Sequence, residues 1–248
     1  MNELDCLFDR SILFFIKFIE HSIGNYVPIC NFTNKKFKMK IVIFGASGKT
    51  GTLMVNQALE LGHQVTSYVR RANALEIEHP NLNVVVGNLN DTEKLKEAIS
   101  GADACLSTLG GSSLTKHAPE IMSGIDKIVS IMERGGVNRF IYLSSVGVGE
   151  SRYCMAQPVR FIVCDLLLRV PFADHHANEQ RLMKSKLQFT LVRPGGLTDG
   201  PKTGNLKHGS EKTILKGNPK ISRANVAAFM LEQLTDSTYV NKGVWLYE

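Results

Sequence analysis

Short apolar runs alternate with segments of helical periodicity from Lys40 onward. The runs are rich in Val and Ile and apolar at nearly every position, which is typical of parallel strands buried on both faces. The predicted strands are Lys40–Phe44, Gln64–Val69, Asn83–Val86, Ala102–Leu106, Arg139–Leu143 and Gln188–Val192. The predicted helices lie near residues 50–61, 91–100, 117–134 and 174–185. This alternation predicts a doubly wound α/β sheet with right-handed crossovers.

The pattern changes after Pro194, where a segment rich in Gly, Thr and Lys begins. A helix near Arg223–Leu234 and a final strand near Gly243–Tyr247 follow it. We therefore expect one Rossmann-fold domain over residues 39–248, with a small C-terminal elaboration on the substrate side. The segment Arg152–Arg169 is rich in Leu, Val, Phe and Arg, and it is expected either to cover the substrate side or to form a subunit contact.

Residues 1–38 differ from the rest of the chain in their pattern of apolar and charged residues. Their apolar run Ile12–Ile19 is short and interrupted by Lys17, and acidic residues precede it where a secretory signal would be basic. Residues 11–22 could form an amphipathic helix on a membrane surface or on the domain. The simpler interpretation, which we favour, is an extension outside the functional domain, with Met39 at the start of that domain.

Composition narrows the function classes further. The chain has 248 residues, of which 44% are apolar and 21% charged, as expected of one domain with a substantial core. It lacks the apolar run of about 18 to 20 residues that a spanning helix needs, so no integral membrane segment is expected. Lys and Arg exceed Asp and Glu by 29 to 23 without a dense basic stripe, so no nucleic-acid partner is expected.

The five cysteines are dispersed and form no Cys-x-x-Cys pair. In a chain of this length they are expected to be reduced packing residues of a cytoplasmic protein, with Cys105 buried. No histidine pair has metal-ligand spacing with a third ligand nearby, so no metal is predicted.

A glycine loop directly follows the first predicted strand, with glycines at Gly45, Gly48 and Gly51. The first glycine permits a tight turn, the second lets the backbone approach a ligand, and the third lets the helix pack closely. The helix that follows presents free amides and its positive dipole end to a pyrophosphate. The loop residues predicted to bind the cofactor are Gly45, Ser47, Gly48, Lys49, Thr50 and Gly51.

The glycine loop has two alternative interpretations. The residues Gly48, Lys49 and Thr50 match the end of an NTPase phosphate loop, but that motif needs a glycine where Ile43 lies inside the strand. The second alternative is that the glycines merely form a tight turn. The strand–loop–helix context favours a dinucleotide site.

The end of the second strand indicates which dinucleotide is bound. Many NAD-binding chains have an acid there for the ribose hydroxyls, whereas this chain has Arg70 and Arg71. Guanidinium groups suit a 2′-phosphate, so NADPH is predicted over NADH, with Arg70 as the main contact and Lys49 or Arg71 assisting. By topology, Asn88 and Leu89 should lie near the adenine. Further predicted cofactor contacts at the end of the fourth strand are Ser107, Thr108 and Leu109.

Three segments carry a family resemblance over nearly all of residues 39–248: the glycine loop, Phe140–Gly147, and Phe189–Leu197 followed by Asp199–Pro201. Through them the chain resembles the atypical short-chain dehydrogenases/reductases with NAD(P)H-binding domains, related to NmrA-like proteins and to flavin reductase (biliverdin-IX-beta reductase). The resemblance implies a nicotinamide between two strand-end loops. One loop is Leu143, Ser144 and Ser145, and the other is Pro194, Gly195, Gly196 and Leu197.

The chain departs from this family at the catalytic positions. Conventional members use a Tyr and a Lys four residues apart, but Tyr142 is followed at that spacing by Val146 and Tyr153 by Gln157. Many atypical relatives have a Lys four residues before a Glu, where this chain has His175.

The flavin reductase pocket offers other candidates for catalysis. His176 matches the histidine that lines this pocket, Ser145 matches the pocket serine, and Ser144 takes the neighbouring hydroxyl position. A histidine can supply the proton that must accompany a hydride transfer. The adjacent histidines can also be surface residues at a helix start, and the serines can simply satisfy backbone groups.

Together these features predict a cytoplasmic, NADPH-dependent reductase that acts on a small, planar, conjugated acceptor such as a flavin or quinone, as a monomer or homodimer. Two alternatives stay open. One is a dinucleotide-binding redox sensor without turnover, and the other is an enzyme like the sugar-nucleotide epimerases or dehydratases.

Overall fold

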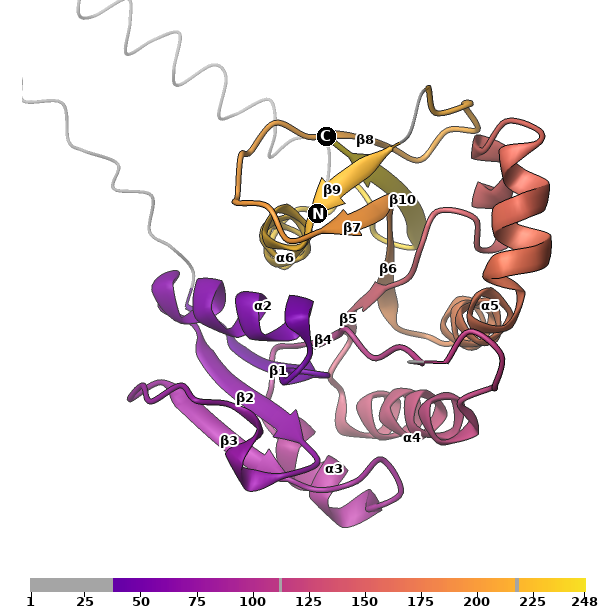
Figure 1. Cartoon of the computed structure of the whole chain (residues 1–248). Helices are drawn as coiled ribbons and strands as arrows, with labels where there is room; N and C mark the ends of the chain where they lie inside the picture. Colours follow the sequence, from indigo (N-terminus) through magenta and orange to yellow (C-terminus); the bar gives the residue numbers. More distant parts are fainter. Residues whose placement is uncertain (1–37, 112, 217–218) are drawn as a thin grey trace, which may run out of the picture. The chain divides into compact units, whose positions relative to one another are not determined.

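The computed structural model describes residues 38–111, 113–216 and 219–248 (Figure 1). The amphipathic helix considered for residues 11–22 lies outside the described residues, as do Cys6 and Cys30. Among the described residues, no helix is long and apolar enough to cross a membrane.

A sheet with the strand order β3-β2-β1-β4-β5-β6-β10-β8 forms the centre of the described domain. Its strands pair in parallel, apart from β8, which is antiparallel to β10. The first six strands have the order of a dinucleotide-binding sheet, which confirms the predicted fold class. The strands are β1 (Lys40–Phe44), β2 (Gln64–Val69), β3 (Leu82–Val86), β4 (Ala104–Ser107), β5 (Arg139–Leu143), β6 (Gln188–Pro194), β8 (Lys207–Gly209) and β10 (Lys242–Tyr247).

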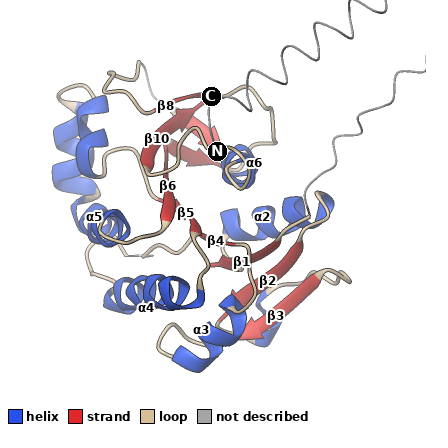
Figure 2. Cartoon of the chain, turned by 180° about the vertical axis from the view of Figure 1, so that it is seen from behind, coloured by secondary structure: helices blue, strands red, loops and turns tan. Residues whose placement is uncertain are grey.

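Helices cover both faces of the sheet (Figure 2). On one face α2 packs beside α6, and on the other α4 packs between α3 and α5. Strand β1 shows why the central strands are largely apolar: Ile41 and Ile43 contribute to one core, whereas Val42 and Phe44 contribute to the other. The helices are α2 (Lys49–Glu60), α3 (Thr92–Ile99), α4 (Pro119–Gly135), α5 (Arg169–Met183) and α6 (Arg223–Glu232).

Local chemistry determines where several helices begin and end. The Asp91 side chain accepts a hydrogen bond from the Lys94 amide at the start of α3, and Ser222 caps α6 in the same way. Helix α4 ends at Gly136, which has a left-handed backbone with a φ of 73°.

Several predicted boundaries were wrong, and the starts of β4 and α5 show the reasons. Strand β4 begins at Ala104 instead of Ala102, because the Asp103 carboxylate accepts a hydrogen bond from the Lys40 amide at the strand start. Helix α5 begins at Arg169, well before residue 174. Pro171 lies in its first turn, where an N–H has no helical partner to lose, so this proline does not interrupt the helix.

The region after β6 contains three short strands that periodicity did not predict. Strands β7 (Gly196–Thr198) and β9 (Lys220–Ser222) form a separate parallel pair, and β8 adds an edge to the main sheet. Each has three residues, which is too short for a period-2 pattern to be visible in the sequence.

Short helical turns complete the domain. They are the 3₁₀ helices η1 (Ala72–Ala74) and η2 (Gly149–Cys154) and the π-helix η3 (Phe161–Leu167). The last two lie within or next to the Arg152–Arg169 segment and precede α5.

Candidate functional site

The glycine loop folds tightly between β1 and α2. Gly45 has a φ of +78°, and an added Cβ there would lie 2.7 Å from Oγ1 of Thr108. An added Cβ on Gly51 would lie 2.1 Å from the carbonyl oxygen of Gly45. The Gly48 amide donates a hydrogen bond to this same oxygen at 3.0 Å. The tight turn and the close helix packing expected of the first and third glycines are therefore present.

The loop leaves the start of α2 open for an anion. The amides of Lys49, Thr50 and Gly51 have no hydrogen-bond partner among the described residues, and Gly48 supplies no side-chain cap. The first turn contains no acidic residue, while Ser47 is exposed beside it. Free amides at the positive end of a helix fit a pyrophosphate, so the residues present suit a dinucleotide.

An exposed ion-pair cluster lies beside the start of α2. Lys49 donates to Asp199 at 3.3 Å, and Arg223 donates to the same carboxylate at 2.6 Å. The hydrogen bond from Lys49, together with the charge of Arg223, lowers the pKa of Asp199. The segment after β7 is thereby tied to the glycine loop, a contact that sequence analysis did not foresee because the two segments are far apart in the chain.

The end of β4 contacts the glycine loop directly. The Thr108 hydroxyl donates to the Gly45 carbonyl at 3.0 Å, and its amide donates to Phe44 at 2.9 Å. Ser107 is buried and accepts a hydrogen bond from the Leu109 amide, while Leu109 packs against the core beneath α3 and α4. The structure thus brings these three predicted residues to the glycine loop.

The two strand-end loops expected around the nicotinamide are also adjacent. Ser144 continues from Leu143 and donates its amide to Val192 at 2.7 Å, and the Val146 amide donates to Pro194 at 2.9 Å. The Ser144 hydroxyl is buried without a hydrogen-bond partner among the described residues, whereas the half-buried Ser145 hydroxyl donates to a local carbonyl.

Backbone contacts hold the remainder of the second loop. The Gly195 amide donates to Leu246, and an added Cβ on Gly195 would lie 2.5 Å from the Pro219 carbonyl oxygen. Gly196 donates to Pro219, and Leu197 pairs with Ile221 in the β7–β9 ribbon. Close backbone packing therefore requires glycine at position 195, whereas a Cβ on Gly196 would make only ordinary contacts at 3.7 Å.

The arginines at the end of β2 are exposed. Arg70 and Arg71 form no ion pair with the residues that the structure describes. Strands β1 and β2 are parallel neighbours, so this arginine pair follows the strand beside the glycine loop. The position suits the predicted contact with a 2′-phosphate.

The residues expected near the adenine, Asn88 and Leu89, also make contacts within the fold. The Asn88 carbonyl accepts a hydrogen bond from the Tyr68 hydroxyl at 2.9 Å. Leu89 packs against Gly124 of α4, where an added Cβ would come within 2.7 Å of the leucine side chain. Asn88 itself is exposed.

His175 lies in the middle of α5 and contacts a buried tyrosine. The expectation that both histidines lie at a helix start was therefore wrong, because α5 begins six residues before His175. The hydroxyl of Tyr142 is 2.7 Å from His175 Nδ1, and the amide of Asn178 donates to the same hydroxyl at 3.0 Å. His175 Nε2 faces the loop after β4, at 3.5 Å from an added Cβ on Gly110.

Burial affects both partners of this contact. Burial lowers the pKa of His175 and raises that of Tyr142. From the sequence, Tyr142 was a candidate for a Tyr–Lys dyad alone, and Asn178 was not predicted as a site residue. A tyrosine within an otherwise apolar strand was an available signal, since a buried hydroxyl normally has a partner.

His176 faces a different space from His175. It is exposed and lines a cavity of about 540 Å³ between η2, η3 and α5, together with Val148, Phe172 and Arg169. An added Cβ on Gly149 would lie 3.4 Å from His176 Nδ1. The two adjacent histidines therefore differ in role: one is hydrogen-bonded inside the fold and the other borders a cavity.

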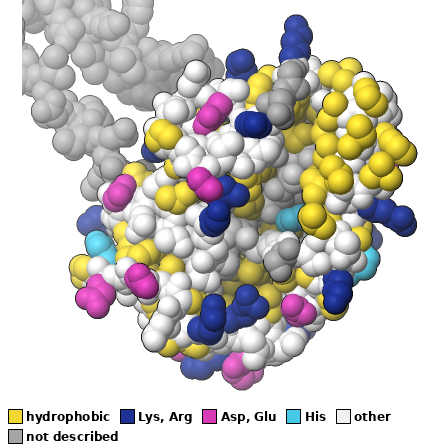
Figure 3. Space-filling view, in the orientation of Figure 1, with side chains coloured by type: hydrophobic (Ala, Val, Ile, Leu, Met, Phe, Trp, Pro, Cys, Tyr) yellow, Lys and Arg dark blue, Asp and Glu magenta, His cyan; other side chains and the backbone are white. Residues whose placement is uncertain are grey.

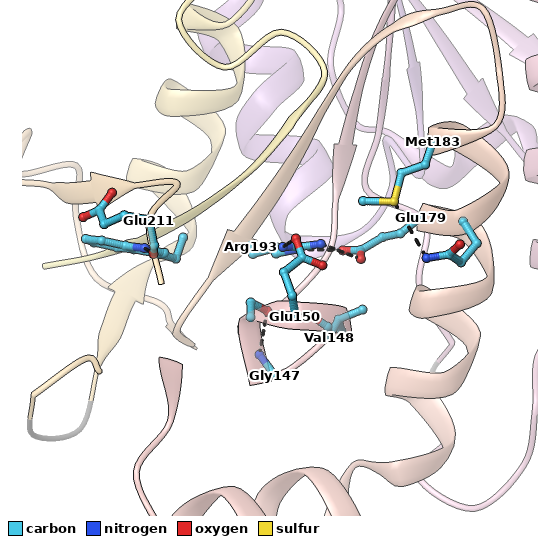
Figure 4. Close-up of polar contacts among 10 residues, drawn as sticks. Gly147, Val148, Glu150, Glu179, Met183, Arg193 and Glu211 are labelled. Atoms are coloured by element: carbon cyan, nitrogen blue, oxygen red, sulfur yellow. Dashed lines mark hydrogen bonds and ion pairs between the residues drawn. The ribbon is translucent and has the colours of Figure 1, made fainter. Parts of the chain in front are cut away.

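A buried ion-pair cluster supports the wall of this region (Figure 4). Arg193 of β6 donates two hydrogen bonds to Glu179 of α5, at 2.9 and 2.8 Å, and a third to Glu150 of η2, at 2.7 Å. Burial by itself would lower the pKa of Arg193, but the two carboxylates raise it. Arg193, which lies within a segment that carries the family resemblance, thus holds β6 to α5 through Glu179.

Comparison with known proteins identifies the family. A family model described as NAD(P)H-binding matches residues 45–237. A chloroplastic protein of Arabidopsis thaliana is 29% identical over 203 residues, covering 79% of this chain and 71% of its own. The sugar epimerase YhfK of Bacillus subtilis, uncharacterized by its own description, is 25% identical over 216 residues, covering 85% of this chain and 94% of its own.

Solved structures show the same fold. The anaerobillin reductase ChuY of Escherichia coli O157:H7 has a TM-score of 0.70 and 24% identity, covering 84% of this chain and 97% of its own. A short-chain dehydrogenase/reductase of Veillonella parvula in complex with NADP has a TM-score of 0.72 and 21% identity, covering 85% and 94%. The matched family and the glycine loop agree: the chain belongs to the NAD(P)H-binding family.

Proposed function

We propose that this protein is an NADPH-dependent reductase that transfers a hydride to a planar, conjugated acceptor such as a flavin or quinone. One observation carries the proposal: the hydrogen-bonded series Asn178–Tyr142–His175, which ends at an imidazole facing the loop after β4. This loop adjoins the glycine loop through Thr108.

The cofactor would be held by the chain's own amides and arginines. The free amides of Lys49, Thr50 and Gly51 would bind the pyrophosphate, and Arg70 and Arg71 would bind the 2′-phosphate. When bound, NADPH supplies the hydride. The remaining task of the chain is to orient the acceptor and supply a proton.

The hydrogen-bond series determines which nitrogen of His175 carries the proton. Asn178 donates its amide hydrogen to the Tyr142 oxygen, and Nδ1 of His175 is the acceptor within reach of the tyrosine hydroxyl hydrogen among the described residues, so the hydroxyl would donate to Nδ1. Because burial lowers the pKa of His175, the ring is neutral near pH 7 and its hydrogen is on Nε2. This N–H would donate a hydrogen bond to an oxygen or nitrogen of the acceptor.

His176 and Ser145 would complete the site. His176 faces the cavity whereas His175 faces the loop after β4, so an acceptor that receives a proton from His176 would extend from this loop into the cavity, where His176 can exchange protons with solvent. Ser145 is half-buried at the end of β5, where its hydroxyl would orient the acceptor. The Ser144 hydroxyl, which lacks a partner among the described residues, is a further donor at this edge of the sheet.

A planar acceptor is supported by the cavity and by the relatives. Tyr153 and Phe172 line the cavity and offer aromatic surface to a conjugated ring system. Tyr142 is fully buried and hydrogen-bonded, so it is not free to act as the tyrosine of a Tyr–Lys dyad. The anaerobillin reductase among the structural neighbours points to the same acceptor class.

Steady consumption of NADPH tests the proposal directly. Absorbance would be followed with purified protein without acceptor and with FMN, riboflavin, small quinones or biliverdin, with NADH in parallel. We expect acceptor-dependent loss that favours NADPH. Tight NADPH binding without turnover on any acceptor would instead favour a redox sensor, and conversion of a sugar nucleotide without net NADPH loss would favour an epimerase.

Cofactor preference has its own test in a matched pair of charge reversals. Arg70→Glu should weaken NADPH binding far more than NADH binding, because NADH lacks the 2′-phosphate. Arg134→Glu makes the same change on an exposed residue at the C-terminal end of α4 and should leave both affinities unchanged. Equal losses for the two dinucleotides in Arg70→Glu would contradict the assignment.

The proton-handling residues can be separated by three variants. His176→Gln should lower kcat by about 100-fold, the usual scale for losing a general acid. Tyr142→Phe removes the hydrogen bond to His175 Nδ1 and should lower kcat while NADPH affinity stays unchanged. Ser145→Ala should raise KM for the acceptor, and full activity in all three variants would refute the assigned roles.

A further inference from the structure

A patch of large apolar side chains is exposed on the outer side of η2, η3 and the loop between them. Figure 3 shows these side chains gathered over the part of the chain that precedes α5. The exposed fractions of the six residues range from 45% to 62%. We call this surface the 153–167 patch, and its members are Tyr153, Val159, Phe161, Ile162, Leu166 and Leu167.

The π-helix η3 is anchored from its inner side. Cys164 is buried in a cluster with Val148 and Phe172, and Val163 and Leu168 pack against this cluster. The inner side of η3 is therefore already packed, while Phe161, Ile162, Leu166 and Leu167 face outward. Apolar side chains that the fold itself does not need at this density indicate contact with something outside the domain.

The border of the patch is cationic. Residues 152–169 contain three arginines and one aspartate, and the aspartate, Asp165, pairs with Arg152 at 2.9 Å. Arg160 lies over the ring of Tyr153, with its guanidinium carbon 5.2 Å from the ring centre. Arg169 is exposed and forms no ion pair with the described residues. The uncompensated charge of this segment is thus carried by Arg160 and Arg169.

This combination selects one occupant. A second copy of the chain in a two-fold contact would place the patch against itself and gather the uncompensated arginines of both copies in one interface. A bilayer with anionic headgroups accepts both features at once, because apolar side chains enter the acyl boundary while arginines stay with the phosphates. Tyr153, with Arg160 stacked on its ring, has the amphipathic character of an interfacial residue.

We propose that the 153–167 patch docks on the surface of an anionic lipid bilayer. Helix η3 would lie at the interface without crossing the membrane. Tyr153, Cys164 and Asp165 from the same segment also line the cavity that contains His176, so docking would place a wall of this cavity against lipid. The docking proposal rests on the surface alone and does not depend on the reaction proposed above.

Vesicle sedimentation of the full chain tests the proposal. The probes are vesicles of phosphatidylcholine alone and of phosphatidylcholine with phosphatidylglycerol. We expect binding to the anionic vesicles, weaker binding to the neutral ones, and a decrease with added salt. Sedimentation that is absent with both vesicle types would overturn the proposal.

Matched variants localise the contact. The double variant Leu166→Gln/Leu167→Gln should lower the vesicle partition coefficient at least about tenfold, and Arg160→Gln should lower it about fivefold. The variants Leu114→Gln and Ile214→Gln alter side chains that are 59% exposed outside the patch and should bind as the wild type does. Because the four apolar side chains are at least 58% exposed, thermal melting of their variants should be unchanged, which separates loss of docking from loss of folding. Arg160 is half-buried over the Tyr153 ring, so the melting temperature of Arg160→Gln is measured beside its vesicle binding.

Two results would assign the surface differently. Unchanged vesicle binding by the patch variants would place the membrane contact elsewhere in the chain and overturn the proposal. Light scattering that shows a dimer of the wild type and a monomer of the Leu166→Gln/Leu167→Gln variant would make the patch a subunit contact instead. NADPH consumption is measured separately, so failure of docking and failure of the reductase proposal are distinguishable.

Discussion

The buried pair Arg193–Glu179 offers the sharpest test of how this fold is held together. Glu179→Gln keeps the shape of the side chain but removes the charge that faces the guanidinium. The side chains of Arg193 and Glu179 are 3% and 1% exposed, so water cannot replace the lost carboxylate. The arginine would keep Glu150, which is 48% exposed and joined by one hydrogen bond.

The expected magnitude follows from this difference in burial. Breaking a buried pair by removing one partner costs about 3–5 kcal/mol, because the other charge is left uncompensated. We expect about 3 kcal/mol for Glu179→Gln, since Glu150 still neutralises part of the charge. Glu150→Gln is the matched control, and because its carboxylate is half exposed we expect a loss of about 1 kcal/mol.

Urea unfolding followed by circular dichroism measures both losses. With a slope of about 2–3 kcal/mol per M, the Glu179→Gln midpoint should fall by about 1 M or more, and the Glu150→Gln midpoint by less than about 0.5 M. Replacing both partners, as Arg193→Met/Glu179→Leu, should recover part of the loss, because no buried charge remains. Equal midpoints for the two single variants would refute the argument from burial.

Two further predictions follow from the site. Gly51→Ala should destabilise the fold and abolish NADPH binding, because the new Cβ would lie 2.1 Å from the Gly45 carbonyl oxygen. Gly135→Ala meets nothing within 4 Å in helix α4 and should melt at or slightly above the wild-type temperature, and similar melting of the two variants would contradict the packing. Burial lowers the pKa of His175 from 6.5, so the unfolded chain binds a proton there at a higher pH than the folded chain. Stability should therefore fall as the pH drops below about 6.5. Thermal melts at about pH 7.5 and about pH 5.5 should show a smaller loss of stability for His175→Asn than for the wild type. The same loss in both proteins would contradict this prediction.

Much of the fold is determined by local sequence pattern. Strands β1, β2 and β5 have the predicted bounds, because strands buried on both faces are short runs rich in apolar residues that local sequence is enough to predict. The glycine loop was equally visible, since the spacing of Gly45, Gly48 and Gly51 expresses a backbone requirement that few other residues meet. The family resemblance rests on the same segments, and the NAD(P)H-binding match confirms it.

The tertiary structure decided how the candidate chemistry is distributed. His175 and His176 are adjacent in the sequence, but the hydrogen-bond partner of His175 is Tyr142, 33 residues away. This contact holds the His175 imidazole inside the fold. The contact between Lys49 and Asp199 joins residues 150 positions apart. Such contacts depend on which helix face meets which strand end, and that is determined by packing of the whole sheet and not by local periodicity. Local pattern therefore determined the scaffold and the phosphate-binding loop, whereas long-range packing determined which polar side chains meet at its edge.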